Sequence, residues 1–185
     1  MLVWGRSVSI LKPAGNRLMR GVRNGLAVVV ALTLGLVAHA ETIVGRVVKV
    51  ADGDTITVLD DQLQQHRIRL AGIDAPEKKQ DFGSRSRENL SRIVAGRTVV
   101  VESNKLDRYG RSVGVVLVDG RDANLAQVQA GMAWWYRAYA REQSVADQTA
   151  YASAEEGART QHRGWWAISE QVAPWVWRRS TREAQ

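Results

Sequence analysis

Three short segments of this chain concentrate side chains that could bind a metal ion and a phosphate group. They are residues 52–55 (DGDT), 74–77 (DAPE) and 107–111 (DRYGR), with Arg69 shortly before the second. Carboxylate oxygens are typical ligands of hard divalent cations. Guanidinium groups bind two phosphate oxygens at once and stay charged. Together the segments predict a metal-dependent phosphodiesterase.

Asp54 and Asp74 are the candidate metal ligands. Asp54 opens one expected strand and Asp74 ends another, and a carboxylate beside a buried strand requires a cation or a hydrogen-bond donor. With a backbone carbonyl and water, two carboxylates can bind a divalent ion such as Ca²⁺. A zinc site is not favoured, because the chain has no Cys and only His66 and His162 follow residue 40.

Glu77, Arg69 and Arg111 are the candidate catalytic residues. Glu77 follows Asp74 by three residues, so it could reach a metal-held water as a general base, a role worth about 10²–10⁴-fold in rate. The two arginines are suited to phosphate oxygens. Taken singly, each has a plainer interpretation: Glu77 as a solvated loop residue, and each arginine as a surface strand residue.

The site also depends on an irregular backbone at Gly72. Strict strand alternation would place Arg69 and Asp74, five residues apart, on opposite faces of one strand. Glycine is typical of bulges and bends that redirect a strand. We therefore expect a bend at Gly72 that turns both side chains toward one pocket.

The hydrophobic pattern predicts an α+β fold. Alternating and β-branched residues indicate five strands, and helical periodicity with capping residues indicates about three α-helices. The strands are expected at 44–50, 56–58, 66–70, 98–102 and 112–118, and the helices at 84–94, from 122 to 131, and from 144 onward. Asp52-Gly53 indicates a two-residue hairpin turn. This order favours a five-stranded OB-type β-barrel.

The first forty residues resemble a secretory signal peptide. Five cationic residues precede an apolar run at 25–37, and Ala38-His39-Ala40 follows it. We expect export to the periplasm or medium and cleavage after Ala40, with no stable membrane association afterwards; an uncleaved anchor is the alternative. The expected organisation is a signal peptide at 1–40, an OB-type barrel domain at 41–167 and a Trp/Arg-rich tail at 168–185.

Most of the net positive charge belongs to the expected signal peptide. The chain carries a formal net charge of +7, from 26 Lys and Arg against 19 Asp and Glu. Removing the five cations before residue 40 leaves 21 against 19, because every acidic residue lies later. Bulk basicity is thus weak support for nucleic-acid binding, and any attraction must come from local arginines and lysines.

Two of the segments resemble motifs of the staphylococcal nuclease-like (thermonuclease) family. The first motif corresponds to residues 52–58 (DGDTITV) with 69–77 (RLAGIDAPE), and the second to 107–111 (DRYGR) followed by Val113-Gly114. The similarity continues through Asn124-Leu125, residues 131–133 and residues 164–166. It extends from about Val44 to Trp166, and the two motifs occur in the family's order.

The resemblance implies an OB-type barrel and calcium-dependent cleavage of DNA and RNA that leaves 3′-phosphate ends. It implies calcium ligation by the carboxylates of Asp54 and Asp74 and the carbonyl of Ala75, where the archetype has threonine. It places Glu77 as the proposed base, Arg69 and Arg111 as the transition-state arginines, and Tyr109 and Tyr139 at the substrate.

Two other classes of function stay open at this point. An OB-type module could hold nucleic acid or another ligand without cutting it, although the acidic and arginine positions of the enzyme are all filled here. An envelope protein that docks a partner through its Trp-rich tail rests on tail composition alone. The pattern requires nothing beyond a monomer, and it does not distinguish DNA from RNA as the substrate.

Overall fold

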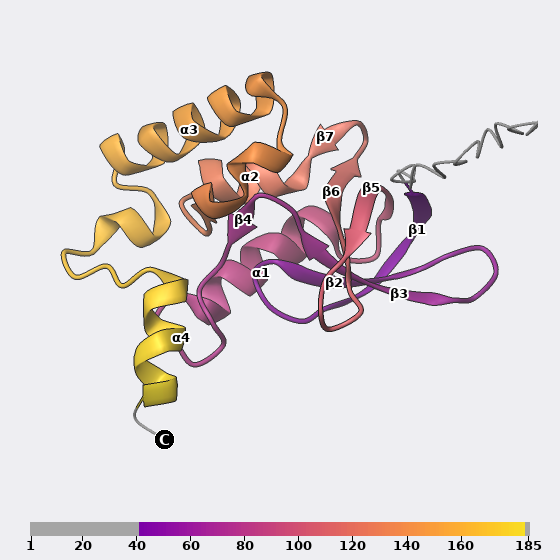
Figure 1. The fold of residues 1–185 in the computed structure, drawn as a ribbon, viewed down its shortest axis with the longest axis horizontal. Helices are drawn as coiled ribbons and strands as arrows, with labels where there is room; N and C mark the ends of the chain where they lie inside the picture. The colour runs from indigo at the N-terminus through magenta and orange to yellow at the C-terminus, as the bar shows by residue number, and fades with distance from the viewer. Residues whose placement is uncertain (1–40, 184–185) are drawn as a thin grey trace, which may run out of the picture. The chain divides into compact units, whose positions relative to one another are not determined.

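The computed structural model describes residues 41–183 (Figure 1). The expected signal peptide therefore lies outside the described residues. Five of the strands close on themselves to form a small barrel. The strands are β1 Glu41–Val50, β2 Thr55–Leu59, β3 Gln65–Leu70, β4 Ile73–Asp74, β5 Thr98–Leu106, β6 Ser112–Val118, β7 Arg121–Asp122 and β8 Trp134–Trp135. The α-helices are α1 Gly83–Val94, α2 Ala123–Gln129, α3 Val145–Thr160 and α4 Pro174–Glu183, and the 3₁₀ helices are Arg137–Glu142 and Gly164–Ala167.

The barrel consists of β3, β2, β1, β5 and β6 in that order. Neighbouring strands pair antiparallel, and a parallel pairing of β3 with β6 closes the ring, with Ile68 opposite Ser112 and Leu70 opposite Gly114. Closure removes the exposed sheet edges. This arrangement confirms the predicted α+β fold with a five-stranded OB-type barrel.

Side chains that alternate along the strands fill the barrel. Ile68 and Leu70 of β3 and Val99 and Val101 of β5 are buried, as period-2 alternation requires. Helix α1 adds buried Leu90 and Val94 to the same core. None of the helices in the described range 41–183 is long and apolar enough to cross a membrane.

The turn between β1 and β2 is longer than the predicted two-residue hairpin. Four residues, 51–54, separate the strands, and Asp54 ends the turn instead of opening β2. The physical reason is a local side-chain bond: the Asp54 amide donates to Asp52 Oδ1 over 3.1 Å, so an Asx-type turn replaces the tighter one. Asp54 is consequently held by the turn and by the strand that follows.

The predicted bend at Gly72 is present. Gly72 has a φ of +71°, a left-handed conformation that other residues adopt only with strain. Beyond it, β4 leaves the barrel and pairs with β8, which places Asp74 opposite Trp134. The bend and this second, two-stranded sheet together fix the backbone of Asp74.

The Trp-rich tail forms a helix that the sequence analysis did not include. A second hydrophobic cluster consists of Trp134, Ala158, Trp165 and Trp166, with Trp175 of α4 packed against it. In this cluster the Trp134 and Trp165 rings meet edge to face, with centroids 5.1 Å apart. Aromatic packing therefore connects the tail to the part of the fold that carries β4 and β8.

Candidate active site

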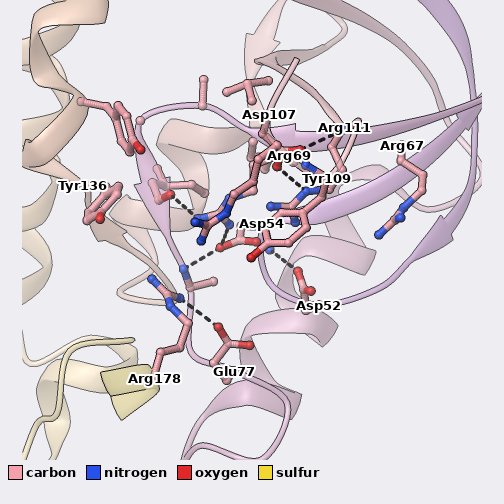
Figure 2. Close-up of a pocket in the computed structure, with 18 of the residues that line it drawn as sticks. Asp52, Asp54, Arg67, Arg69, Glu77, Asp107, Tyr109, Arg111, Tyr136 and Arg178 are labelled. Atoms are coloured by element: carbon pink, nitrogen blue, oxygen red, sulfur yellow. Dashed lines mark hydrogen bonds and ion pairs between the residues drawn. The ribbon is translucent and has the colours of Figure 1, made fainter. Parts of the chain in front are cut away.

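The predicted site residues gather in one open pocket of about 1050 Å³ (Figure 2). Seven of the eight line it: Asp54, Arg69, Ala75, Glu77, Tyr109, Arg111 and Tyr139. The eighth, Asp74, is fully buried and reaches the site through its bond to Arg69. The pocket wall comes from the β1–β2 turn, β3, the loop after β4, the β5–β6 turn, the 3₁₀ helix Arg137–Glu142 and α4.

Arg69 connects the two candidate metal ligands. Its Nη1 forms an ion pair with Asp54 Oδ2, and its Nη2 donates to Asp74 Oδ1 over 2.9 Å. The two aspartates are nearly excluded from water, with Asp54 5% and Asp74 0% exposed. The bend at Gly72 thus achieves the convergence that strand alternation alone would have prevented.

Burial and neighbouring charges act in opposite directions on the carboxylates. Burial works to raise the pKa of Asp54, but the ion pair with Arg69 outweighs it, and the pKa lies below its usual value. Burial raises the pKa of Asp74 despite the opposing effects of Arg178 and Arg69. Burial, together with the charge of Asp54, raises the pKa of Asp52 to about 6. Such crowding of acids favours the arrival of further positive charge.

The oxygen atoms at this site are suitable ligands for a hard divalent cation. Asp54 and Asp74 supply carboxylate oxygens, and the Ala75 amide donates to Asp54 Oδ2 over 2.8 Å, which holds Ala75 against the same carboxylate. Among residues 41–183, no group of three or more His, Cys, Asp or Glu is arranged to hold an ion. The carboxylates of Asp54 and Asp74 are oxygen ligands of the kind that such cations take.

Thr55 links the second arginine to the acidic pair. Arg111 Nη1 donates to Thr55 Oγ1 over 3.1 Å, and Thr55 Oγ1 donates to Asp54 Oδ1 over 3.1 Å. Arg111 Nε also donates to Asp107 Oδ2 over 2.7 Å. Asp107 also accepts hydrogen bonds from the backbone amides of Tyr109 and Arg111. The β5–β6 turn itself therefore orients the guanidinium of Arg111.

Glu77 lies in the loop after β4, on the other side of Asp54 from Arg111 (Figure 2). Its side chain is 37% exposed, and its Oε1 accepts a hydrogen bond of 2.9 Å from Arg178. Water in the pocket can therefore reach this carboxylate, as a general base requires.

Tyr109 and Tyr139 expose aromatic surface at the pocket rim. Tyr109 is 63% exposed, with the guanidinium groups of Arg108 and Arg111 against its ring. Tyr139 lies against Tyr136, with ring centroids 5.3 Å apart, and Lys105 covers its face. Exposed aromatic rings can stack on nucleobases, and the cations beside them can bind phosphates.

Arg178 is the contributor that the sequence analysis missed. It comes from α4, and its guanidinium bonds both Asp74 and Glu77. The spacing of Trp175, Arg178 and Arg182 along one helical face is the available signal, together with Pro174 at the first helical position. That signal predicts a helix, but it does not indicate where the helix docks.

Comparison with known proteins places these features in a family. The model of the protein family named staphylococcal nuclease homologue matches residues 67–168 of this chain. The chain belongs to the staphylococcal nuclease-like family. An uncharacterized endonuclease of Escherichia coli O157:H7 is 45% identical over 135 residues, which cover 72% of this chain and 84% of that protein.

Two further relatives of the family carry nuclease names. A micrococcal nuclease of Shigella flexneri is 41% identical over 149 residues, covering 76% of this chain and 83% of the relative. A staphylococcal-like nuclease of Arabidopsis thaliana is 35% identical over 119 residues, covering 64% of this chain and 35% of the relative. These matches support a nuclease function in general, with nucleic acid as the substrate.

Proposed function

We propose that this protein is an exported, calcium-dependent endonuclease that hydrolyses phosphodiester bonds of DNA or RNA and leaves 3′-phosphate ends. The observation that carries the proposal is the convergence of Asp54, Asp74 and Glu77 with Arg69 and Arg111 around one open pocket. These groups can supply proton transfer and charge stabilisation for phosphodiester hydrolysis.

In the proposed reaction, Glu77 accepts a proton from a water molecule, and the resulting hydroxide attacks phosphorus. The bond from phosphorus to the 5′ oxygen of the next nucleotide breaks, and that oxygen leaves as a hydroxyl after it takes up a proton. Arg69 and Arg111 bind the negative charge that builds on the phosphoryl oxygens, and such preorganised charge stabilisation is usually the largest single contribution.

Asp54, Asp74 and the carbonyl of Ala75 would hold the divalent ion. When bound, the ion would neutralise charge on the scissile phosphate. Tyr109, which lies against Arg111, would then contact the substrate near that phosphate, while Tyr139 at the rim would contact a base. The choice of calcium rests on the family resemblance and on the all-oxygen donor set.

The direct test is incubation of the purified protein with single-stranded DNA, first with Ca²⁺ and then with a chelator. We expect cleavage with Ca²⁺ and its loss in the chelator, because without the ion the negative charge of Asp54 and Asp74 would oppose binding of the scissile phosphate. The products should carry 5′-hydroxyl ends, which a polynucleotide kinase labels without prior phosphatase treatment. Binding of DNA without any cleavage under these conditions would instead support the non-catalytic module.

Export is the part of the proposal that rests on the N-terminal segment alone. Its support is the sequence of five cations, an apolar run and Ala38-His39-Ala40. We expect the protein to be recovered from the periplasm or the medium with Glu41 as its first residue, as measured by intact mass. A product that retains residues 1–40 in the membrane fraction would favour the uncleaved anchor.

A further inference from the structure

Helix α4 is fixed at its beginning to the rim of the active-site pocket. Trp175 lies against Tyr136, with ring centroids 5.4 Å apart, and against Trp134 at 6.4 Å. Just before the helix, the carbonyl of Val172 accepts a hydrogen bond of 2.6 Å from the buried side chain of Gln80. The helix therefore has a defined position, and its next turn faces the acidic residues.

Arg178, one turn beyond Trp175, contacts two of the three candidate acids, Asp74 and Glu77. Figure 2 shows it beside Glu77. Its Nη1 donates to Asp74 Oδ1 over 3.1 Å and to Glu77 Oε1 over 2.9 Å, and its Nη2 donates to Asp74 Oδ2 over 2.7 Å. Arg69 also bonds Asp74 Oδ1. Guanidinium groups thus occupy both oxygens of Asp74 and one oxygen of Glu77.

A divalent cation and Arg178 would compete for the same carboxylate. Calcium approaches its oxygen ligands to 2.3–2.6 Å, and Arg178 already lies at hydrogen-bond distance from both oxygens of Asp74. Like charges at such a separation repel strongly in a partly buried site. Arg69 belongs to the barrel strand β3 and has 18% of its side chain exposed, whereas Arg178 is 34% exposed on a surface helix. Arg178 is therefore the group that can move.

We propose that Arg178 is a built-in competitor of the divalent cation. In the cation-free protein it neutralises Asp74 and occupies Glu77, and binding of the ion displaces it from both. The contact is autoinhibitory, since it holds the candidate base and a candidate metal ligand until the ion arrives. The inference rests on the proposed calcium dependence, and it assigns a role to the Trp/Arg-rich tail.

Calcium binding, measured by isothermal titration with CaCl₂ alone, tests this competition. We expect Arg178→Gln to bind Ca²⁺ about 10- to 100-fold more tightly than the wild type, the equivalent of roughly one charge-assisted hydrogen bond released. Arg179→Gln is the matched control, because Arg179 is exposed on the same helix and the substitution removes the same charge. Its Ca²⁺ affinity should equal that of the wild type.

Thermal unfolding provides a second measurement, in which Arg178→Gln should lower the stability of the Ca²⁺-free protein but increase the stabilisation by Ca²⁺. Without Ca²⁺, Arg178→Gln should unfold at a lower temperature than the wild type, since Asp74 and Glu77 lose their partner. Saturating Ca²⁺ should raise its unfolding temperature by more than it raises that of the wild type. If Arg178 had only a structural role, its substitution would lower the unfolding temperature equally with and without Ca²⁺. That result would overturn the competition.

The outcomes separate this inference from the proposed function. If the wild type cleaves DNA with Ca²⁺ but Arg178→Gln binds the ion no more tightly, the competition is overturned and the calcium-dependent nuclease stands. If neither protein binds Ca²⁺ and neither cleaves DNA, both proposals fall together. If Arg179→Gln raises the Ca²⁺ affinity as much as Arg178→Gln does, the gain comes from the lower positive charge of the surface. That result would also contradict the specific role of Arg178.

Discussion

Asp54→Asn is expected to abolish calcium-dependent cleavage, with a fall of at least about 10³-fold in rate. A metal ion supplies several kcal/mol of charge stabilisation, and each 1.36 kcal/mol corresponds to about tenfold in rate. Asparagine keeps an oxygen that can accept from the Ala75 amide but removes the charge that the ion and Arg69 require. The initial rate on single-stranded DNA at saturating Ca²⁺ is the measurement.

Calcium-induced stabilisation distinguishes a lost ion from a damaged fold. For the wild type, Ca²⁺ at 100 times its dissociation constant should add about 2.7 kcal/mol to the free energy of unfolding. For Asp54→Asn we expect no such gain, and a loss of about 1–3 kcal/mol without Ca²⁺ because a charged hydrogen-bond partner is gone. Asp61→Asn, exposed in the β2–β3 turn, is the control and should match the wild type. Undiminished cleavage by Asp54→Asn would contradict the assigned ligand.

Arg111→Ala is expected to lower kcat by about 10²–10³-fold, the usual cost of removing one preorganised donor to a developing negative charge. KM should change little if the guanidinium acts mainly in the transition state. The fold should persist, because Arg111 lies at the pocket edge and its partners Asp107 and Thr55 keep other hydrogen bonds. Steady-state kinetics on denatured DNA and thermal unfolding measure the two effects.

Arg108→Ala is the matched control for Arg111. Arg108 lies in the same β5–β6 turn, carries the same charge and is exposed, and it contacts the ring of Tyr109. We expect its kcat to stay near that of the wild type, with any change confined to KM. Full activity of Arg111→Ala, or an equal loss of kcat in Arg108→Ala, would count against a specific role for Arg111 in the chemistry.

Local residue chemistry made much of the barrel predictable. Alternating β-branched residues indicated β2, β5 and β6, and the glycine at position 72 indicated the bend that follows β3. Both depend on conformational preferences of a few neighbouring residues, which a sequence contains directly. The turn at Asp52 was predicted too short, because the bond from Asp52 Oδ1 to the Asp54 amide competes with the tighter hairpin.

The position of helix α4 could not be predicted from the sequence. The tail at 168–185 was recognised as rich in Trp and Arg, and no role was assigned to it. Its position depends on Trp175 packing against Tyr136 and Trp134, contacts between segments some forty residues apart along the chain. Apolar burial is non-directional, so composition predicts that the tryptophans become buried but does not predict which surface they cover.

The sequence by itself determined the chemical inventory of the site: the acidic residues, the arginines and their order in two family motifs. The tertiary structure alone decided how these charges pair. It placed Arg69 between Asp54 and Asp74, joined Arg111 to Asp54 through Thr55, and brought Arg178 onto Asp74 and Glu77 from the far end of the chain. The physical reason is that electrostatic interaction depends on distance and burial in three dimensions, and spacing along a chain specifies neither.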